Sequence, residues 1–255
     1  MQASMPVTRS IIPRLSEWVD QFTTRLPEPE RDPLPSGGFR WRHGAPNADS
    51  LLVTKAVRIA SGLRAALMLA DNRHTVETGV ILRTVADFSA EVMFIAEGVL
   101  EGRLTQEQAE FIEQHHAPLA RTADEFAERE HQWYVGRKAI AKAQRRLAEK
   151  WGADPEFLQK LTEFLNYGYD SYVHGKYESA MELFSGADMR FMMNGTESDH
   201  AVCVALTSVA GKLGEALNAF SAIAIVWKMG TLADDIRAEF NRLHGSDEEG
   251  GAGCV

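Results

Sequence analysis

Two segments that lie far apart in the chain carry the side chains best suited to acid–base chemistry. Arg83 and Glu91 are separated by two successive steps of four residues, which places both on one face of a helix. The segment 166–177, with the sequence NYGYDSYVHGKY, brings the hydroxyl of Tyr172 close to the imidazole of His174. An imidazole can act as acid, base or ligand near neutral pH. We therefore expect these four residues to form a polar cluster, either as a catalytic site or as a buried network that gives the core its specificity.

Each half of this polar cluster also has a purely structural interpretation. Apolar residues such as Phe94 share the side of the helix that carries Arg83, and they favour burial of that side. Glu77 nearby favours a solvated stripe instead, on which a pair between Arg83 and Asp87 would contribute little stability. His174 equally fits a core histidine that is hydrogen-bonded to a neighbouring helix and surrounded by packed tyrosines. The sequence leaves both interpretations open.

A second set of candidate residues follows the Glu-x-x-His spacing, which occurs three times. In carboxylate-bridged dimetal bundles, two such motifs come from different helices. Here the first two motifs fall on one predicted helical segment and cannot converge, and the glutamate of the third precedes its helix. A dimetal carboxylate enzyme is therefore the least favoured function, and we expect no metal or other cofactor. The three pairs are Glu113 with His116, Glu128 with His131, and Glu197 with His200.

Net charge and missing motifs narrow the class of protein. A net charge of -9 argues against a broad surface that coats nucleic acid. A basic run over 137–150 would hold phosphates or form a solvated helix surface. The sequence contains no Walker phosphate loop, no dinucleotide-binding glycine fingerprint and no Gly-x-Ser-x-Gly nucleophile elbow. These absences weigh against the commonest NTPases, dehydrogenases and hydrolases.

The elements that must position the candidate residues are helices. The segment 73–99 repeats apolar residues with a heptad rhythm and is apolar on most sides, which predicts a buried helix. A helix capped by Asn47 or Asp49 precedes it and ends near Asp71. Because the two helices follow almost directly on each other, we expect them to form an antiparallel hairpin.

Further helix starts are readable along the rest of the chain. Thr105 with Gln108 forms a capping box for a third helix, which is expected to be long and kinked at Pro118. Asp199 is expected to cap the last long helix, and a shorter terminal helix is expected over 232–243. No alternating strand pattern of convincing length occurs between them.

Together these patterns predict an all-α protein, an antiparallel bundle of about six to seven helices with a Pro/Gly-rich loop after the N-terminal helix. The expected divisions are an N-terminal helix over 1–26, a Pro/Gly-rich linker or docked loop over 27–46, the helical bundle domain over 47–244, and a disordered tail over 245–255.

The cellular setting and assembly can also be anticipated. Two cysteines imply no disulfide framework and favour a reducing cytoplasm. The most apolar run, 219–227, is shorter than the ~20 residues that a membrane helix needs, so we read it as core and expect no membrane partner. The N-terminal amphipathic helix and the apolar last long helix both predict a homodimer.

Two motifs resemble a poorly characterised group of bacterial all-helical proteins. They are ILRTVADFSAEVMF over 81–94 and YDSYVHGKY over 169–177, and the resemblance covers about residues 47–185. Some members of the group are similar in layout to HEPN-like helical domains, which include toxin and defence ribonucleases. The resemblance implies that the important positions are the four residues of the polar cluster, Arg83, Glu91, Tyr172 and His174.

The HEPN nuclease signature is an arginine followed, after four to six residues, by a histidine. One match occurs here, Arg237 with His244, although Ala238 stands where the family commonly has a polar residue. The resemblance would give Arg237 the task of stabilising the phosphorane and His244 that of acid or base at the 2′-hydroxyl.

Three functions therefore remain under consideration. The leading hypothesis is a HEPN-like RNA-cleaving or RNA-binding module of stress or phage defence, with RNA as partner. The alternative is a non-catalytic helical module that binds a partner protein or a small ligand through a buried polar network. The dimetal enzyme is third.

Overall fold

Helices make up most of the described part of the computed structural model, which confirms the predicted all-α bundle. The structure describes residues 5–33, 37–116, 140, 142, 145–146, 154, 156, 160, 172–174, 180–185 and 187–245. Within these residues, the helices with assigned bounds are α1 (Met5–Thr23), α2 (Ala48–Asp71), α3 (Thr75–Leu100), α4 (Gln106–His116), α8 (Asp199–Val226) and α9 (Gly230–Gly245).

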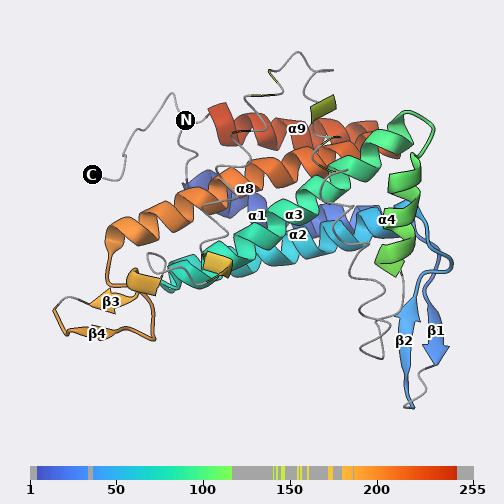
Figure 1. The fold of residues 1–255 in the computed structure, drawn as a ribbon. Coiled ribbons are helices and arrows are strands. Elements are labelled where there is room, and N and C mark those ends of the chain that lie inside the picture. The colour runs from blue at the N-terminus through green and yellow to red at the C-terminus, as the bar shows by residue number, and fades with distance from the viewer. Residues whose placement is uncertain are drawn as a thin grey trace.

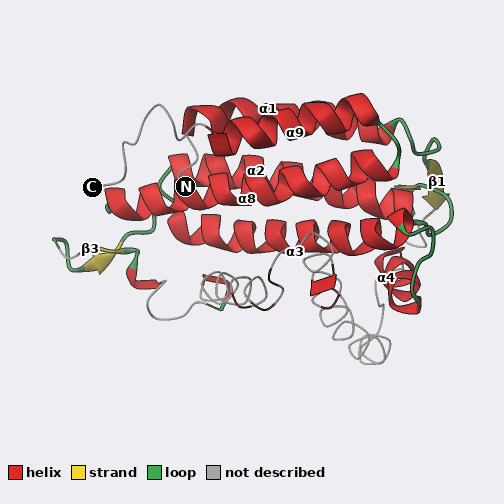
Figure 2. Cartoon of the chain, turned by 90° about the horizontal axis from the view of Figure 1, so that it is seen from above, coloured by secondary structure: helices red, strands yellow, loops and turns green. Residues whose placement is uncertain are grey.

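The five long helices run alongside one another in three rows. In Figure 2, α1 and α9 lie along one side, α2 and α8 run through the middle, and α3 lies along the other side. Helix α4 lies at one end of α3, where it packs against both α2 and α3. The predicted hairpin of α2 and α3 is confirmed, because these two helices are sequential and packed along their lengths.

Helix α3 is buried on nearly every side, as its apolar pattern predicts. Of its 26 residues, Glu77 and Leu100 alone are exposed. The helix packs against α2 and α8. Its charged side chains therefore need oppositely charged or hydrogen-bonding groups within contact distance.

Helix α8 is the second central element and is longer than the apolar run read from the sequence. It has 28 residues, and its most apolar stretch has a mean hydropathy of 1.4. By length and composition alone this helix could cross a membrane, but 67% of that stretch is buried inside the bundle. Phe220 and Ile223 are fully buried, which confirms the prediction that the run 219–227 is core.

The helix starts follow the predicted capping chemistry closely. The side chain of Asn47 accepts a hydrogen bond from the backbone amide of Ser50 at 2.8 Å. In the capping box, the backbone N–H of Gln108 donates to Thr105 Oγ1 at 3.2 Å. In return, the backbone N–H of Thr105 donates to Gln108 Oε1 at 2.8 Å. At α8 the N-cap is Ser198, one residue earlier than expected, because its hydroxyl accepts from the backbone three residues on.

Two short hairpins correct the expectation that the chain has no strands. Strand β1 (Glu30–Pro33) pairs with β2 (Phe39–Arg42) inside the Pro/Gly-rich segment, and β3 (Phe184–Ser185) pairs with β4 (Arg190–Phe191). Figure 1 shows them at opposite ends of the bundle. These strands have two to four residues, too few for an alternating pattern to stand out from the sequence.

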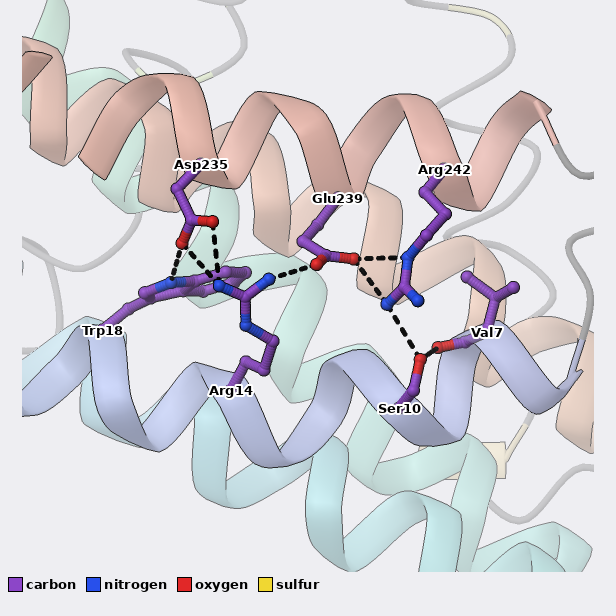
Figure 3. Close-up of polar contacts among 7 residues, drawn as sticks. All are labelled: Val7, Ser10, Arg14, Trp18, Asp235, Glu239 and Arg242. Carbon is purple, nitrogen blue, oxygen red and sulfur yellow. Dashed lines mark hydrogen bonds and ion pairs between the residues drawn. The ribbon is translucent and has the colours of Figure 1, made fainter. Parts of the chain in front are cut away.

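A polar cluster joins the first helix to the last. In Figure 3, Arg14 of α1 binds both carboxylate oxygens of Asp235 at 2.7 and 2.8 Å and also pairs with Glu239. The indole of Trp18 donates to Asp235 at 2.9 Å, and Arg242 pairs with Glu239 from the other side. Burial opposes ionisation of Asp235, but the hydrogen bonds from Arg14 and Trp18 outweigh it and lower its pKa. We call these five residues the α1–α9 clasp.

The turn between α2 and α3 is tied to the segment that precedes α8. Arg73 has a φ of 68°, and its guanidinium donates to the Thr196 carbonyl at 2.7 Å and to Asp199 at 2.9 Å. The Thr196 amide returns a hydrogen bond to the Arg73 carbonyl at 2.9 Å. Gly195 has a φ of 102° and lies against that same carbonyl, where a side chain does not fit.

Cys203, in the first turns of α8, is disulfide-bonded. This finding differs from the expectation that the cysteines form no disulfide. Cysteine usage therefore no longer favours a reducing compartment.

Candidate ligand-binding site

Two ionisable residues with shifted pKa values, Glu91 and His115, lie where α2, α3 and the last turn of α4 meet. Glu91 of α3 forms an ion pair with Lys55 of α2, with 2.6 Å between Nζ and Oε2. Both side chains are largely buried, at 11% exposed for Lys55 and 18% for Glu91. Burial raises the pKa of Glu91, and the attraction of Lys55 offsets that effect only in part. Among the described residues, no hydrogen bond of good geometry reaches Glu91 Oε2, so the lysine charge is its main stabilisation.

A pocket of about 490 Å³ opens beside this ion pair. The Lys55 ammonium lies 4.5 Å from the centroid of the Phe88 ring, and the Arg58 guanidinium lies 5.7 Å from the same centroid. Such cation–π contacts hold a cation near an apolar surface. The lining consists of Thr54, Lys55, Val57, Arg58, Phe88 and His115.

His115 lines the pocket from α4 and is held there by a hydrogen bond to α2. Its Nε2 lies 2.9 Å from Thr54 Oγ1. Thr54 Oγ1 also lies 2.9 and 3.0 Å from the carbonyl oxygens of Ser50 and Leu51. This contact ties the His115 ring to α2, whichever of the two atoms carries the shared proton.

The environment of His115 holds the ring neutral. Burial, helped by the positive charges of Lys55 and His116, lowers the pKa of His115 to about 4. At neutral pH the wall of the pocket thus presents an uncharged imidazole.

His116 makes a parallel contact with the start of α2. Its Nδ1 donates to the Ile112 carbonyl at 2.8 Å, and its Nε2 lies 2.7 Å from Ser50 Oγ. The two neighbouring histidines therefore attach α4 to α2 by one hydroxyl each. This pair of contacts positions His115 at the pocket.

The four residues of the predicted polar cluster occupy different surroundings. Arg83 pairs with Asp87, one turn away on α3, as the surface interpretation anticipated, yet its side chain is only 11% exposed. The Tyr172 hydroxyl donates to Glu182 at 2.8 Å, and its ring covers Gly79 of α3 so closely that a methyl group there would meet it at 2.5 Å.

The other two residues of the predicted polar cluster are Glu91 and His174. Glu91 pairs with Lys55, a residue that the sequence analysis did not single out. His174 is exposed, so it does not belong to a buried network. Of the four, Glu91 is the one that borders the pocket region.

The other candidate residues are spread over the molecule. Arg237 is exposed on α9, and His244 lies two turns later, with its ring 4.3 Å from that of Phe240. Among the described residues, no group of three or more metal-ligating side chains gathers, and Glu113, Glu197 and His200 form none. Glu128 and His131 lie outside the described residues.

Sequence reasoning missed Lys55, Arg58, Phe88 and His115 as a set. One signal for Lys55 exists: it lies between the apolar residues Leu51–Val53 and Ala56–Val57, so a cation interrupts an apolar stretch of a predicted helix. A buried lysine demands a buried carboxylate, and Glu91 of the adjoining helix is the nearest suitable residue.

Comparisons with known proteins add no relative. No protein-family model matches the chain, and no curated protein and no solved structure is significantly similar to it.

Proposed function

We propose that this chain is a non-catalytic helical module that binds a small ligand in the pocket between α2, α3 and α4. The observation that carries the proposal is the buried ion pair of Lys55 and Glu91 beside a pocket of about 490 Å³. Ligand pockets of proteins have volumes of roughly 300–1,000 Å³ and combine apolar walls with a few fixed polar groups. The described pocket has this composition, with Phe88 and Val57 as apolar walls and His115 held by its hydrogen bond with Thr54.

The proposal is tested by blocking the pocket without disturbing the core. Val57 lines the pocket and is 43% exposed, so Val57→Trp fills the space from the surface. The matched control is Val204→Trp, because Val204 is 46% exposed on α8, which does not line the pocket. Nuclear magnetic resonance titration with small aromatic probes is expected to shift backbone amides around the pocket in the parent protein and in the control.

In the Val57→Trp variant these shifts are expected to disappear. The proposal is wrong if the aromatic probes leave the pocket amides of the parent protein unmoved, or if they shift them equally in the pocket-filled variant.

Metal-independent RNA cleavage is the second candidate function. It is supported by the exposure of Arg237 and by the position of His244 two turns further along α9, on the same side of that helix. Arg237→Ala and His244→Ala are then expected to abolish cleavage of a labelled single-stranded RNA, while Arg64→Ala, an exposed arginine on α2, leaves it unchanged. Equal RNA cleavage by all three variants and the parent would exclude this function.

A further inference from the structure

The charges around the pocket leave a single cation without a partner. Lys55 is neutralised by Glu91 at 2.6 Å, and Arg83 is paired with Asp87. Arg58 is exposed at the pocket, and among the described residues it makes no hydrogen bond or ion pair. The described lining of the pocket therefore carries one unmatched positive charge.

The third ionisable residue of the described lining, His115, adds no charge. His115 is neutral at pH 7 because burial and the nearby Lys55 lower its pKa to about 4. A dianion such as a phosphate monoester would need a second cation, which the described lining does not supply. A monoanion matches the charge that is present.

The apolar part of the lining points to the rest of the ligand. Phe88 and Val57 offer apolar surface beside the Arg58 guanidinium, and the Phe88 ring already holds two cations near it. An apolar or aromatic body can bury surface against these side chains while a planar carboxylate receives paired N–H bonds from the arginine.

We infer that the pocket binds a small monocarboxylate with an apolar or aromatic body, with Arg58 as the residue that binds the carboxylate. This inference rests on the proposed function, since it names the ligand class of the same pocket. Lys55 then has a positioning role, because its ammonium is engaged by Glu91 and fixes the position of the Phe88 ring.

The test compares three probes of similar shape and different charge: benzoate, the neutral benzamide and the dianionic phenyl phosphate. Binding is followed by nuclear magnetic resonance titration of the full chain at pH 7 and low ionic strength. Benzoate is expected to bind about tenfold more tightly than benzamide, the ratio that one charge-assisted hydrogen bond to a carboxylate would give. The preference is expected to shrink when salt is added, because the arginine is exposed.

Two arginine variants separate the role of Arg58 from general surface charge. Arg58→Gln is expected to reduce benzoate affinity to that of benzamide and to leave benzamide affinity unchanged. Arg64→Gln is the control, since Arg64 is an exposed arginine of the same helix that instead contacts Ser16 of α1. This control is expected to keep the full preference for benzoate.

The outcomes distinguish the ligand class from the proposed function. If benzamide or phenyl phosphate binds at the pocket as tightly as benzoate, or if Arg58→Gln keeps the preference, the monocarboxylate assignment is wrong while the pocket remains a binding site. If none of the three probes moves the pocket amides, the binding function itself is wrong, and the monocarboxylate assignment fails with it.

Discussion

The ion pair between Lys55 and Glu91 lies beneath the pocket, and each member depends on the other. Glu91 is buried, its pKa is raised, and Lys55 is the close cation in its surroundings. Lys55→Met leaves this carboxylate without a counter-charge, and we expect the free energy of unfolding at pH 7 to fall by about 3 kcal/mol. Urea unfolding measures this change.

The double variant provides the control for that prediction. Lys55→Met with Glu91→Leu removes both charges and keeps the apolar volume, so most of the lost stability is expected to return. If the double variant is as unstable as the single one, the loss comes from packing and not from the unpaired charge.

His115 predicts how stability depends on pH. Its pKa lies at about 4 in the folded protein, against an ordinary value of 6.5. Between these values the unfolded chain binds the proton and the folded chain does not, so this residue makes stability fall as pH drops from 6.5 towards 4. Above pH 6.5 the effect is absent.

Urea unfolding between pH 4 and 8 tests this linkage. His115→Gln is expected to flatten the loss of stability on acidification, and His174→Gln, which changes an exposed histidine, is expected to leave it intact. Glu91 works in the opposite direction, because its raised pKa favours the folded, protonated form, so the comparison is made between variants and parent. Parallel pH profiles for the parent and the His115 variant would contradict the assignment.

At the scale of elements, the turn from α2 to α3 depends on a glycine in a distant segment. Gly195 has a φ of 102°, and an added Cβ would lie 2.7 Å from the Arg73 carbonyl oxygen. Gly195→Ala is therefore expected to lower the free energy of unfolding by about 1–3 kcal/mol.

A second glycine serves as the control. It separates the backbone strain at Gly195 from the general effect of replacing a glycine by alanine. Gly211 lies within α8, and an added Cβ there would meet no atom within 4 Å. Gly211→Ala is expected to raise stability by up to about 1 kcal/mol, because alanine loses less conformational freedom in a helix. Thermal unfolding of both variants tests the pair, and a stabilising Gly195→Ala would show that the turn adapts.

Helix boundaries were largely predictable because they depend on local chemistry. The Asn47 cap and the capping box of Thr105 with Gln108 need only residues three positions apart, and both are confirmed. The hairpins were not predictable. Strand β3 has two residues, and its pairing with β4 depends on a neighbouring strand more than on its own composition.

The candidate site was also predictable only in part, because its contacts depend on a neighbouring helix as well as on local sequence. Glu91 was found because a charge on a buried helix needs a partner. Its partner was expected along the same chain segment or in the segment around His174, whereas Lys55 comes from α2. The rotation of two packed helices about their axes decides which side chains meet, and the sequence pattern of one helix does not specify it.

For the whole molecule, the surfaces that motivated the homodimer prediction are used within one chain. Trp18 and Phe22 of α1 are buried and contact the ring of Phe220 in α8. Both apolar helix faces are thus covered intramolecularly. The homodimer stays a prediction, and it would require a surface other than these two.

The α1–α9 clasp predicts how strongly the first and last helices of the bundle are joined. Asp235→Ala removes the partner of both Arg14 and Trp18, and we expect the free energy of unfolding to fall by about 1–2 kcal/mol, since the pair is part-exposed. Asp234→Ala is the control at a neighbouring exposed aspartate. Equal urea midpoints for the two variants would show that the clasp contributes no stability.

The same clasp has a consequence for the order of events during synthesis. The Trp18 indole can form its hydrogen bond only after Asp235, 217 positions later in the chain, has been synthesised. A ribosome that adds roughly 5–20 residues per second needs on the order of ten seconds or more to deliver it. For most of that interval Trp18 and Phe22 lack the ring of Phe220, and α1 has only the earlier helices, such as α2, to pack against.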